Sequence, residues 1–269
     1  RDPEMSRGLG DVYKRQRIHH GHSFGLSYHT DRLYRSMRLL GIRPVTAPDE
    51  FTEIVEVVVE ESEIEEGYVK IIVTRGSDDH NFTIPARSAL QPNVLVYGKP
   101  IDLNAIEKVQ FGVNCITLDD DRGHHCDILS LNQLNNMMAR AEAQKKNCYD
   151  AVFIKDGLLT EASHSNVCIV KAGVIWTPAT NEHMIRGVTR SLVLTRAAPS
   201  AGVTSIDEAS EPVRFEDMMT AEEVFLTNSQ DGIIPVLSID GNLIGGGKVG
   251  DVTQKIQAHY AHLMEDGLP

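Results

Sequence analysis

Three stretches of this 269-residue chain each have the pattern of two short strands joined by a tight turn. In each stretch, two apolar runs flank a dipeptide that ends in glycine, which easily adopts the positive φ of a two-residue hairpin turn. The stretches are "YDAVFIKDGLLTE" (149–161), "NVCIVKAGVIWTP" (166–178) and "IIPVLSIDGNLIG" (233–245). Hairpins join antiparallel strands, so the fold is not a regular series of parallel βαβ units.

Helical and extended segments alternate irregularly around these hairpins. Apolar periodicity and β-branched runs predict the remaining elements: helices at 49–64, 131–146, 251–266 and after Gly187, and strands at 67–76, 92–98, 107–118, 223–228 and near Val203. The segment "GKPIDLN" (98–104) has the composition of a connection. We therefore predict an α+β fold with two domains: a small N-terminal α/β domain at 17–98, a linker at 99–103 and a large domain at 104–269.

Composition narrows the class of protein. The formal net charge of −12 and the pI near 5.3 argue against nucleic acid as a partner. No apolar run approaches the length of a membrane span, so we expect no membrane partner. The four cysteines are spread without a C-x-x-C motif and no secretory signal is visible, so we expect reduced thiols in the cytoplasm.

The first sixteen residues, "RDPEMSRGLGDVYKRQ", differ from the rest of the chain. They show neither helical nor strand periodicity and begin with Arg1 instead of methionine. They are similar to adaptor read-through at the ends of translated sequence fragments, the alternative being a flexible natural N-terminus. We predict that residues 1–16 are non-native, lie outside the fold and replace a missing native start.

Two stretches could bind an anionic or ring-containing ligand. In "MIRGVTRSLVL", Gly187 precedes a helix whose free N–H groups, at Val188 and Thr189, could bind an anion. Every helix has such an N-terminus, so this signal is weak alone. In "LLTEASHSNVCIV", Glu161 ends a strand before small hydroxyl residues; a solvated loop and a carboxylate for a pyridine nitrogen both remain open.

Taken together, these stretches resemble the fold-type IV pyridoxal-phosphate enzymes: D-amino-acid transaminases, branched-chain aminotransferases and aminodeoxychorismate lyases. The resemblance extends from about Arg17 to the final helix, and the D-amino-acid transaminase branch is the most similar. The matching strings occur in family order: "HTDRLYRS", "VTRG", "CDILSLNQLNN", "EAQKKNCYDAVF", "LTEASHSNV", "IRGVTR" and "GGGKVGDVTQKI". The resemblance implies two domains, the larger with a pseudo-barrel of strands, and a homodimer that acts on an amino acid and a 2-oxo acid.

The resemblance also implies a role for individual residues in binding pyridoxal 5'-phosphate. Arg32 would bind the phosphate from the small domain, and Glu161 would pair with the pyridine nitrogen. The remaining cofactor-binding positions implied are Ser165, Ile185 against the ring face, Val188 and Thr189 at the phosphate, Asn228 and the hydroxyl of Ser229. His80 and Arg87 would contact the substrate from the segment "SDDHNFTIPARSAL", which is shorter than in D-amino-acid transaminases.

One departure matters most: the family's Schiff-base lysine position is Leu129, where D-I-K-S-L-N is expected and this chain has "DILSLN". Leucine can neither bond covalently to the cofactor nor transfer a proton, and acid–base catalysis alone contributes about 10²–10⁴-fold. Lys145 and Lys146 would lie about 20 Å along a helix and cannot substitute. The N-terminal strands of the branch, with their substrate-contacting tyrosine, are also expected to be absent.

Two interpretations therefore remain open: an aminotransferase disabled at Leu129, and a pseudoenzyme that binds the cofactor, or its adduct with an amino acid, without turnover. Both predict non-covalent cofactor binding. The histidines of "HHGH" (19–22) and the pair His124-His125 lack a ligand set with zinc spacing, so we predict no metal site.

Overall fold

A computed structural model describes residues 11–76, 90–203, 206–207 and 212–268 and divides the chain into two compact units. Unit 1 contains the chain up to Ile101, the short segment Ile128–Gln133 and the C-terminal end from Gly267. Unit 2 contains Asp102–Asp127 and Leu134–Asp266. Within the described ranges, no helix is both long and apolar enough to cross a membrane.

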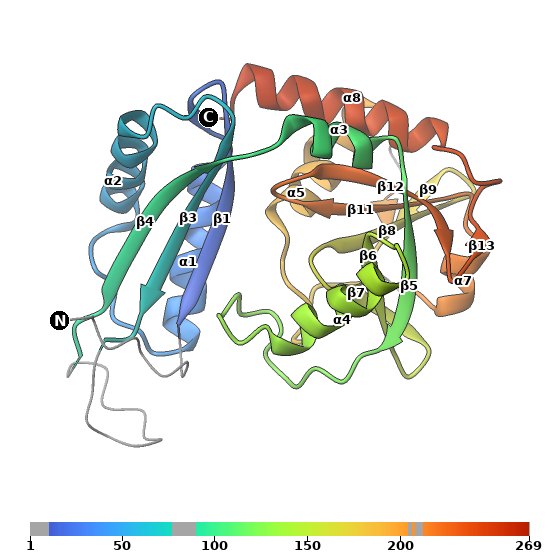
Figure 1. The fold of residues 1–269 in the computed structure, drawn as a ribbon, viewed down its shortest axis with the longest axis horizontal. Helices are drawn as coiled ribbons and strands as arrows, with labels where there is room; N and C mark the ends of the chain where they lie inside the picture. The colour runs from blue at the N-terminus through green and yellow to red at the C-terminus, as the bar shows by residue number, and fades with distance from the viewer. Residues whose placement is uncertain (1–10, 77–89, 204–205, 208–211, 269) are drawn as a thin grey trace. The chain divides into compact units, whose positions relative to one another are not determined.

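Unit 1 is a four-stranded antiparallel sheet packed against two helices (Figure 1). The strand order is β2-β1-β3-β4, and the first helix begins after Gly25, whose positive φ ends the preceding turn. Apolar residues of both helices and of β1 and β3 form one core. The elements are β1 (Val12–His19), β2 (His22–Ser23), α1 (Leu26–Leu39), α2 (Pro48–Glu61), β3 (Gly67–Thr74) and β4 (Asn93–Pro100).

Strand β1 corrects two predictions for the described residues: that the chain before Arg17 lies outside the fold, and that the N-terminal strands are absent. Residues Val12–Ile18 pair in unbroken register with β3, and Val12 and Ile18 are fully buried in the core. The strand forms because the ladder needs only an extended backbone and some apolar side chains facing α1 and α2. Whether the segment is native to the protein is a separate prediction.

The segment Ile128–Gln133 joins unit 1 through β1. Ser130 forms an isolated antiparallel bridge with Val12, the Tyr13 N–H donates to the Leu129 carbonyl over 3.1 Å, and the Leu131 N–H donates to the Asp11 carbonyl over 3.1 Å. The Tyr13 hydroxyl also donates to the Gln133 side chain over 2.8 Å. Leu129 is therefore fixed by backbone contacts to the first strand.

Unit 2 is built on a mixed sheet in which β5 runs parallel to both of its neighbours. The strand order is β10-β9-β8-β11-β12-β5-β6-β7, with β13 paired to β12. The three predicted hairpins are confirmed as the pairs β6/β7, β8/β9 and β12/β13. The strands are β5 (Val113–Asp119), β6 (Asp150–Lys155), β7 (Leu158–Ala162), β8 (Asn166–Lys171), β9 (Val174–Trp176), β10 (Ile206–Asp207), β11 (Glu223–Asn228), β12 (Gly232–Ile239) and β13 (Asn242–Leu243).

Helices complete unit 2, and one sequence prediction there is wrong. The first residues of the predicted strand 107–118 belong in fact to α3 (Leu103–Gln110), whose N-terminus is capped by the Asp102 side chain, and β5 begins only at Val113. The strand predicted near Val203 corresponds to the short strand β10. The remaining helices are α4 (Leu134–Lys145), α5 (Val188–Leu192), the π-helix Val193–Ala197, α6 (Ala198–Ser200), α7 (Phe215–Met219) and α8 (Asp251–Asp266).

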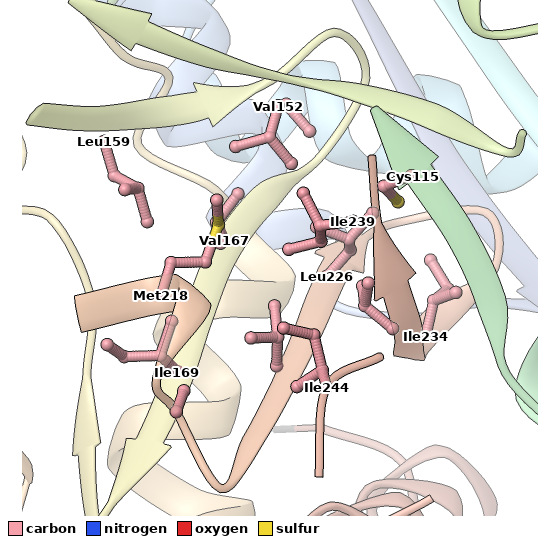
Figure 2. Close-up of a cluster of buried hydrophobic side chains, with 14 of the residues drawn as sticks. Cys115, Val152, Leu159, Val167, Ile169, Met218, Leu226, Ile234, Ile239 and Ile244 are labelled. Atoms are coloured by element: carbon pink, nitrogen blue, oxygen red, sulfur yellow. The ribbon is translucent and has the colours of Figure 1, made fainter. Parts of the chain in front are cut away.

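The main core of unit 2 lies between the strands of the sheet and α7 (Figure 2). Side chains from β5, β6, β8, β11 and β12 meet there, and Met218 of α7 packs among them with no exposed surface. Burying one large apolar side chain contributes about 1.5–3 kcal/mol. This core fixes the ends of β5 and β7, from which the polar residues described next project.

Candidate functional site

A buried carboxylate, Glu161 at the end of β7, is the centre of the candidate site in unit 2. Its side chain is only 4% exposed. One carboxylate oxygen accepts the Arg122 guanidinium N–H over 2.6 Å, and the other accepts the Ile185 N–H over 2.9 Å and the Asn166 amide over 3.3 Å. Burial raises the pKa of Glu161 to about 7, although Arg122 acts to lower it.

Arg122 is the main residue that sequence reasoning missed. It follows β5 in the loop, and its guanidinium group donates to both oxygens of Asp120, over 2.9 and 2.8 Å, and to the His183 carbonyl over 3.1 Å. Its guanidinium carbon, Cζ, also lies over the Phe153 ring, 4.3 Å from the ring centre. The only signal in the sequence is a single arginine after the acidic run "DDD" (119–121) at the end of a strand.

Asp120 is itself held in place from β7. The Thr160 hydroxyl donates to Asp120 over 2.7 Å, next to the chain position of Glu161. Burial acts to raise the pKa of Asp120, but the hydrogen bonds from Arg122 and Thr160 prevail and the pKa is lowered. Asp120 is therefore ionised at neutral pH, and Arg122 lies between two carboxyl groups.

Asn166 connects Glu161 to the start of α5. Its amide donates to Glu161 and, over 2.8 Å, to the Ile185 carbonyl. Gly187 is required beside it, because a Cβ on residue 187 would lie under 3.0 Å from the Asn166 side-chain oxygen. The backbone at Ile185 and Gly187 is thus fixed against the same amide that contacts the carboxylate.

The predicted residues Val188 and Thr189 occupy the first turn of α5, and both are buried. The N-cap is Gly187, which has no side chain to satisfy the first N–H groups. The Thr189 hydroxyl lies 3.5 Å from the Tyr260 hydroxyl of α8. A helix start and a buried hydroxyl thus lie together here, and their binding of an anion stays a prediction.

A second polar network contains two more predicted residues, Ser165 and Asn228. The Asn228 amide donates to the Ser165 hydroxyl over 3.1 Å, and Ser165 donates to Asp150 over 3.4 Å. Tyr149, which sequence reasoning also missed, donates to Asp231 over 2.5 Å in the same network. Ser229 follows β11 and is half-buried.

The comparisons with known proteins give the family. The sequence pattern of the class IV amino-transferases matches residues 11–239. A D-alanine aminotransferase of Bacillus licheniformis is 36% identical over 250 residues, 93% of this chain and 86% of that protein. One from Staphylococcus aureus (strain N315) is 30% identical over 258 residues, 96% of this chain and 89% of that protein.

These matches, which cover most of each chain, decide the family. The chain belongs to the class IV aminotransferases. Its fold agrees with this assignment: the branched-chain amino acid aminotransferase of Escherichia coli superposes with a TM-score of 0.84 at 22% identity, covering 95% of this chain and 86% of the other. Class IV aminotransferases use pyridoxal phosphate, so the residues described above can be tested against that group.

The described residues fit two parts of pyridoxal phosphate and not its covalent anchor. Glu161 is a buried carboxylate suited to a protonated ring nitrogen, and the start of α5 suits a phosphate. In unit 1, Arg32 lies on α1, and Leu129 provides no amine. His80 and Arg87 lie outside the described residues.

Unit 1 also contains a cluster of basic residues that sequence reasoning did not predict. It consists of Lys14 on β1 and of His29, Arg32 and Arg35 on α1. Lys14 of β1 is fully buried, and its ammonium nitrogen has no hydrogen-bond partner within the described ranges. Burial, followed by the charges of Arg32 and Arg35, lowers the pKa of Lys14 well below its usual value. Burial and the charge of Arg32 lower the pKa of His29 in the same way. The charge of Arg32 thus acts together with burial to disfavour a proton on Lys14 and on His29.

Two groups of side chains come close enough to share a metal ion, in contrast to the expectation of none. In the first, Glu66 lies beside His19 and His20, but Arg17 already pairs with Glu66 over 2.6 Å. In the second, Glu182 lies beside the exposed His124 and beside His183, whose ring is 3.5 Å from the Lys155 ammonium group. An arginine or a lysine at each group opposes cation binding, so neither supports a metal site.

Proposed function

We propose that this chain is a class IV aminotransferase of the D-amino-acid branch that binds pyridoxal phosphate without a covalent bond and turns over amino acids very slowly. The observation that carries the proposal is the combination of a buried Glu161 network with leucine at position 129. The similarity to D-alanine aminotransferases over most of both chains supports the choice of branch.

The residues proposed to hold the cofactor are those that the family resemblance implies. Arg32 and the first turn of α5, with Thr189, would bind the phosphate, and Ser229 would add a hydroxyl. Glu161 would keep a proton on the pyridine nitrogen. When bound, pyridoxal phosphate supplies an electron sink for the substrate's α-carbon. None of these contacts depends on a lysine.

Leu129 is the reason for slow turnover. Its carbonyl accepts the Tyr13 N–H over 3.1 Å, so its backbone is bound to β1. Its side chain carries only methyl groups, so no group at this position can move a proton. A purely binding role, the pseudoenzyme interpretation, corresponds to complete loss of turnover in the same experiment.

The test is a comparison of wild type, Leu129→Lys and Leu129→Met, where methionine is a control of similar volume without an amine. We expect all three to bind pyridoxal phosphate, and only L129K to gain a shifted visible absorbance band and a borohydride-stable bond, located by mass spectrometry at position 129. Relative to wild type, L129K should also accelerate the half-reaction with D-alanine by at least about 10²–10⁴-fold. In L129K, D-alanine should react faster than L-alanine.

Two results would contradict the proposal. A wild-type chain that transaminates D-alanine as fast as L129K would show that leucine does not disable it. Failure of all three proteins to bind pyridoxal phosphate would show that the Glu161 network serves another purpose.

The proposed enzyme is a cytoplasmic homodimer. The four cysteines are all free thiols, which suits a reducing compartment. Leu134, Met137 and Met138 project from one side of α4 and are each more than half exposed, and such an apolar surface is typical of a protein interface. Light scattering that gives a monomer would contradict the dimer.

A further inference from the structure

We infer that Asp120 and Arg122 act as a pair of positioning residues that set the charge state of Glu161, and hence the pyridine nitrogen's affinity for its proton. The inference rests on the proposed function, because it concerns the same carboxylate. It assigns a role to two residues that sequence reasoning missed.

The geometry places one cation between two carboxylates. Arg122 donates to Glu161 over 2.6 Å through one terminal nitrogen and to Asp120 over 2.8 Å through the other. The side chains of all three residues are at most 6% exposed, so water screens these interactions very little. Each carboxylate therefore responds to the charge of the guanidinium group and to that of the other carboxylate.

The charges of the three groups do not balance by themselves. With both acids ionised, two negative charges surround one positive charge, which leaves one negative charge buried. A protonated pyridine nitrogen at Glu161 would supply the missing positive charge. Either a proton on Glu161 or a pyridinium nitrogen beside it would therefore make the cluster neutral.

Asp120 has a distinct effect in this arrangement. Without Asp120, the full charge of Arg122 would act on Glu161 and make it a weaker base. Without Arg122, two carboxylates would share a buried region, and Glu161 would hold its proton more tightly. The pair thus leaves Glu161 ionisable near neutral pH, and the ionised carboxylate would stabilise a proton on a pyridine nitrogen beside it.

Other titratable groups around the cluster are few among the described residues. The Cys126 thiol interacts with Arg122, Glu161 and Asp120, and the Lys155 ammonium group interacts with the same thiol. The His183 ring lies beside Lys155, while its backbone carbonyl accepts from Arg122. Among the charged groups of the described residues, Arg122 and then Asp120 act most strongly on the Glu161 carboxylate.

The test measures the Glu161 side chain in the cofactor-free protein, so it does not depend on cofactor binding. Carbon-13 NMR of glutamate-labelled protein follows the carboxyl signal against pH, with Glu161→Gln to assign it. We expect Arg122→Met to raise the pKa of Glu161 by about 1–3 and Asp120→Asn to lower it by about 1. A purely structural role would not move the two variants in opposite directions.

A second readout uses 4-deoxypyridoxine 5'-phosphate, which has the ring and phosphate of the cofactor but no aldehyde. The affinity of the protein for this analogue should rise with pH as Glu161 ionises. The midpoint of the rise should lie at a lower pH in D120N, and at a higher pH in R122M, than in wild type. If the NMR shifts occur but the analogue does not bind, the proposed function fails, whereas the role of Asp120 and Arg122 in setting the charge of Glu161 stands.

Equal or unchanged pKa values of Glu161 in wild type, D120N and R122M would overturn the inference, as would shifts of the same sign. If R122M does not fold, D120N decides alone. A lowered pKa of Glu161 in D120N supports the role of the pair, and an unchanged or raised one refutes it.

Discussion

The titration of Glu161 should be visible in the stability of the cofactor-free protein. Burial raises the pKa of this carboxyl from 4.5 to about 7 in the folded state. Between these two values the folded protein binds the proton more tightly than the unfolded chain does. The stability that this group contributes is therefore fully present below about pH 4.5 and is lost as the pH rises through about 7.

The size of the effect follows from the two pKa values. A difference of one pKa corresponds to about 1.4 kcal/mol, so a rise from 4.5 to about 7 corresponds to about 3 kcal/mol in the free energy of unfolding. The group is buried, so solvent screening removes little of this contribution. For a domain with a typical stability of about 5–15 kcal/mol, such a loss is measurable.

Urea unfolding of wild type and Glu161→Gln between pH 5 and pH 8.5 measures this effect. Glutamine cannot titrate, so the wild-type free energy of unfolding should fall relative to that of E161Q by about 2.5 kcal/mol over this range. Glu142→Gln is the matched control, since Glu142 is an exposed carboxylate paired with Lys145 over 3.0 Å. E142Q should run parallel to wild type above pH 5.

The reasoning is refuted if the free energy of unfolding of wild type changes with pH in parallel with that of E161Q from pH 5 to 8.5. That result would mean that Arg122 offsets the cost of burying Glu161 completely, so that the carboxylate is ionised throughout. A wild-type protein that becomes more stable than E161Q as the pH rises would refute it more strongly, because the sign would be reversed.

Three further predictions concern stability. Lys14→Met should raise the free energy of unfolding at pH 7 by about 1–4 kcal/mol in urea titrations, because it removes a buried amine without a partner in the described part of the chain. Gly187→Ala should lower the melting temperature by displacing Asn166, a cost of about 1–3 kcal/mol that a serine at position 166 should partly relieve. Glu223 accepts the Thr253 N–H and hydroxyl at the start of α8, so Glu223→Ala should cost about 0.5–2 kcal/mol and speed hydrogen exchange in that turn.

The hairpins were predictable because their signal is local. Asp156-Gly157 and Ala172-Gly173 have positive φ at both positions, as two-residue hairpin turns require, and apolar runs flank them on both sides. No distant residue is needed to specify such a turn. The same holds for α8, whose apolar periodicity is contained in sixteen consecutive residues.

Helix α3 was not predictable from its own sequence. It is only eight residues long, and the Gly and Pro before it indicated a connection. A helix this short is marginal by itself and depends on its Asp102 cap and on tertiary packing. Gln257 of α8 donates to the Gln110 carbonyl at its C-terminal end, a contact between residues far apart in the chain.

The candidate site shows the same division between local and distant information. Glu161 was predicted because its motif is contiguous, whereas Arg122 precedes it by 39 positions and meets it only when β5 and β7 are assembled. An ion pair leaves no periodic pattern in either segment. The sequence around Arg122 does not predict which carboxylate of the chain this arginine will contact.

In strand β1, the backbone pairing and the side-chain environment depend on different features of the sequence. Its ladder with β3 needs only extended residues, so the segment 12–16 pairs correctly whatever its origin. Lys14, in contrast, is fully buried, and burial together with the charges of Arg32 and Arg35 opposes a proton on its amine. The ladder is thus specified by the extended backbone, whereas the charge state of the side chain at position 14 depends on residues of another element, α1.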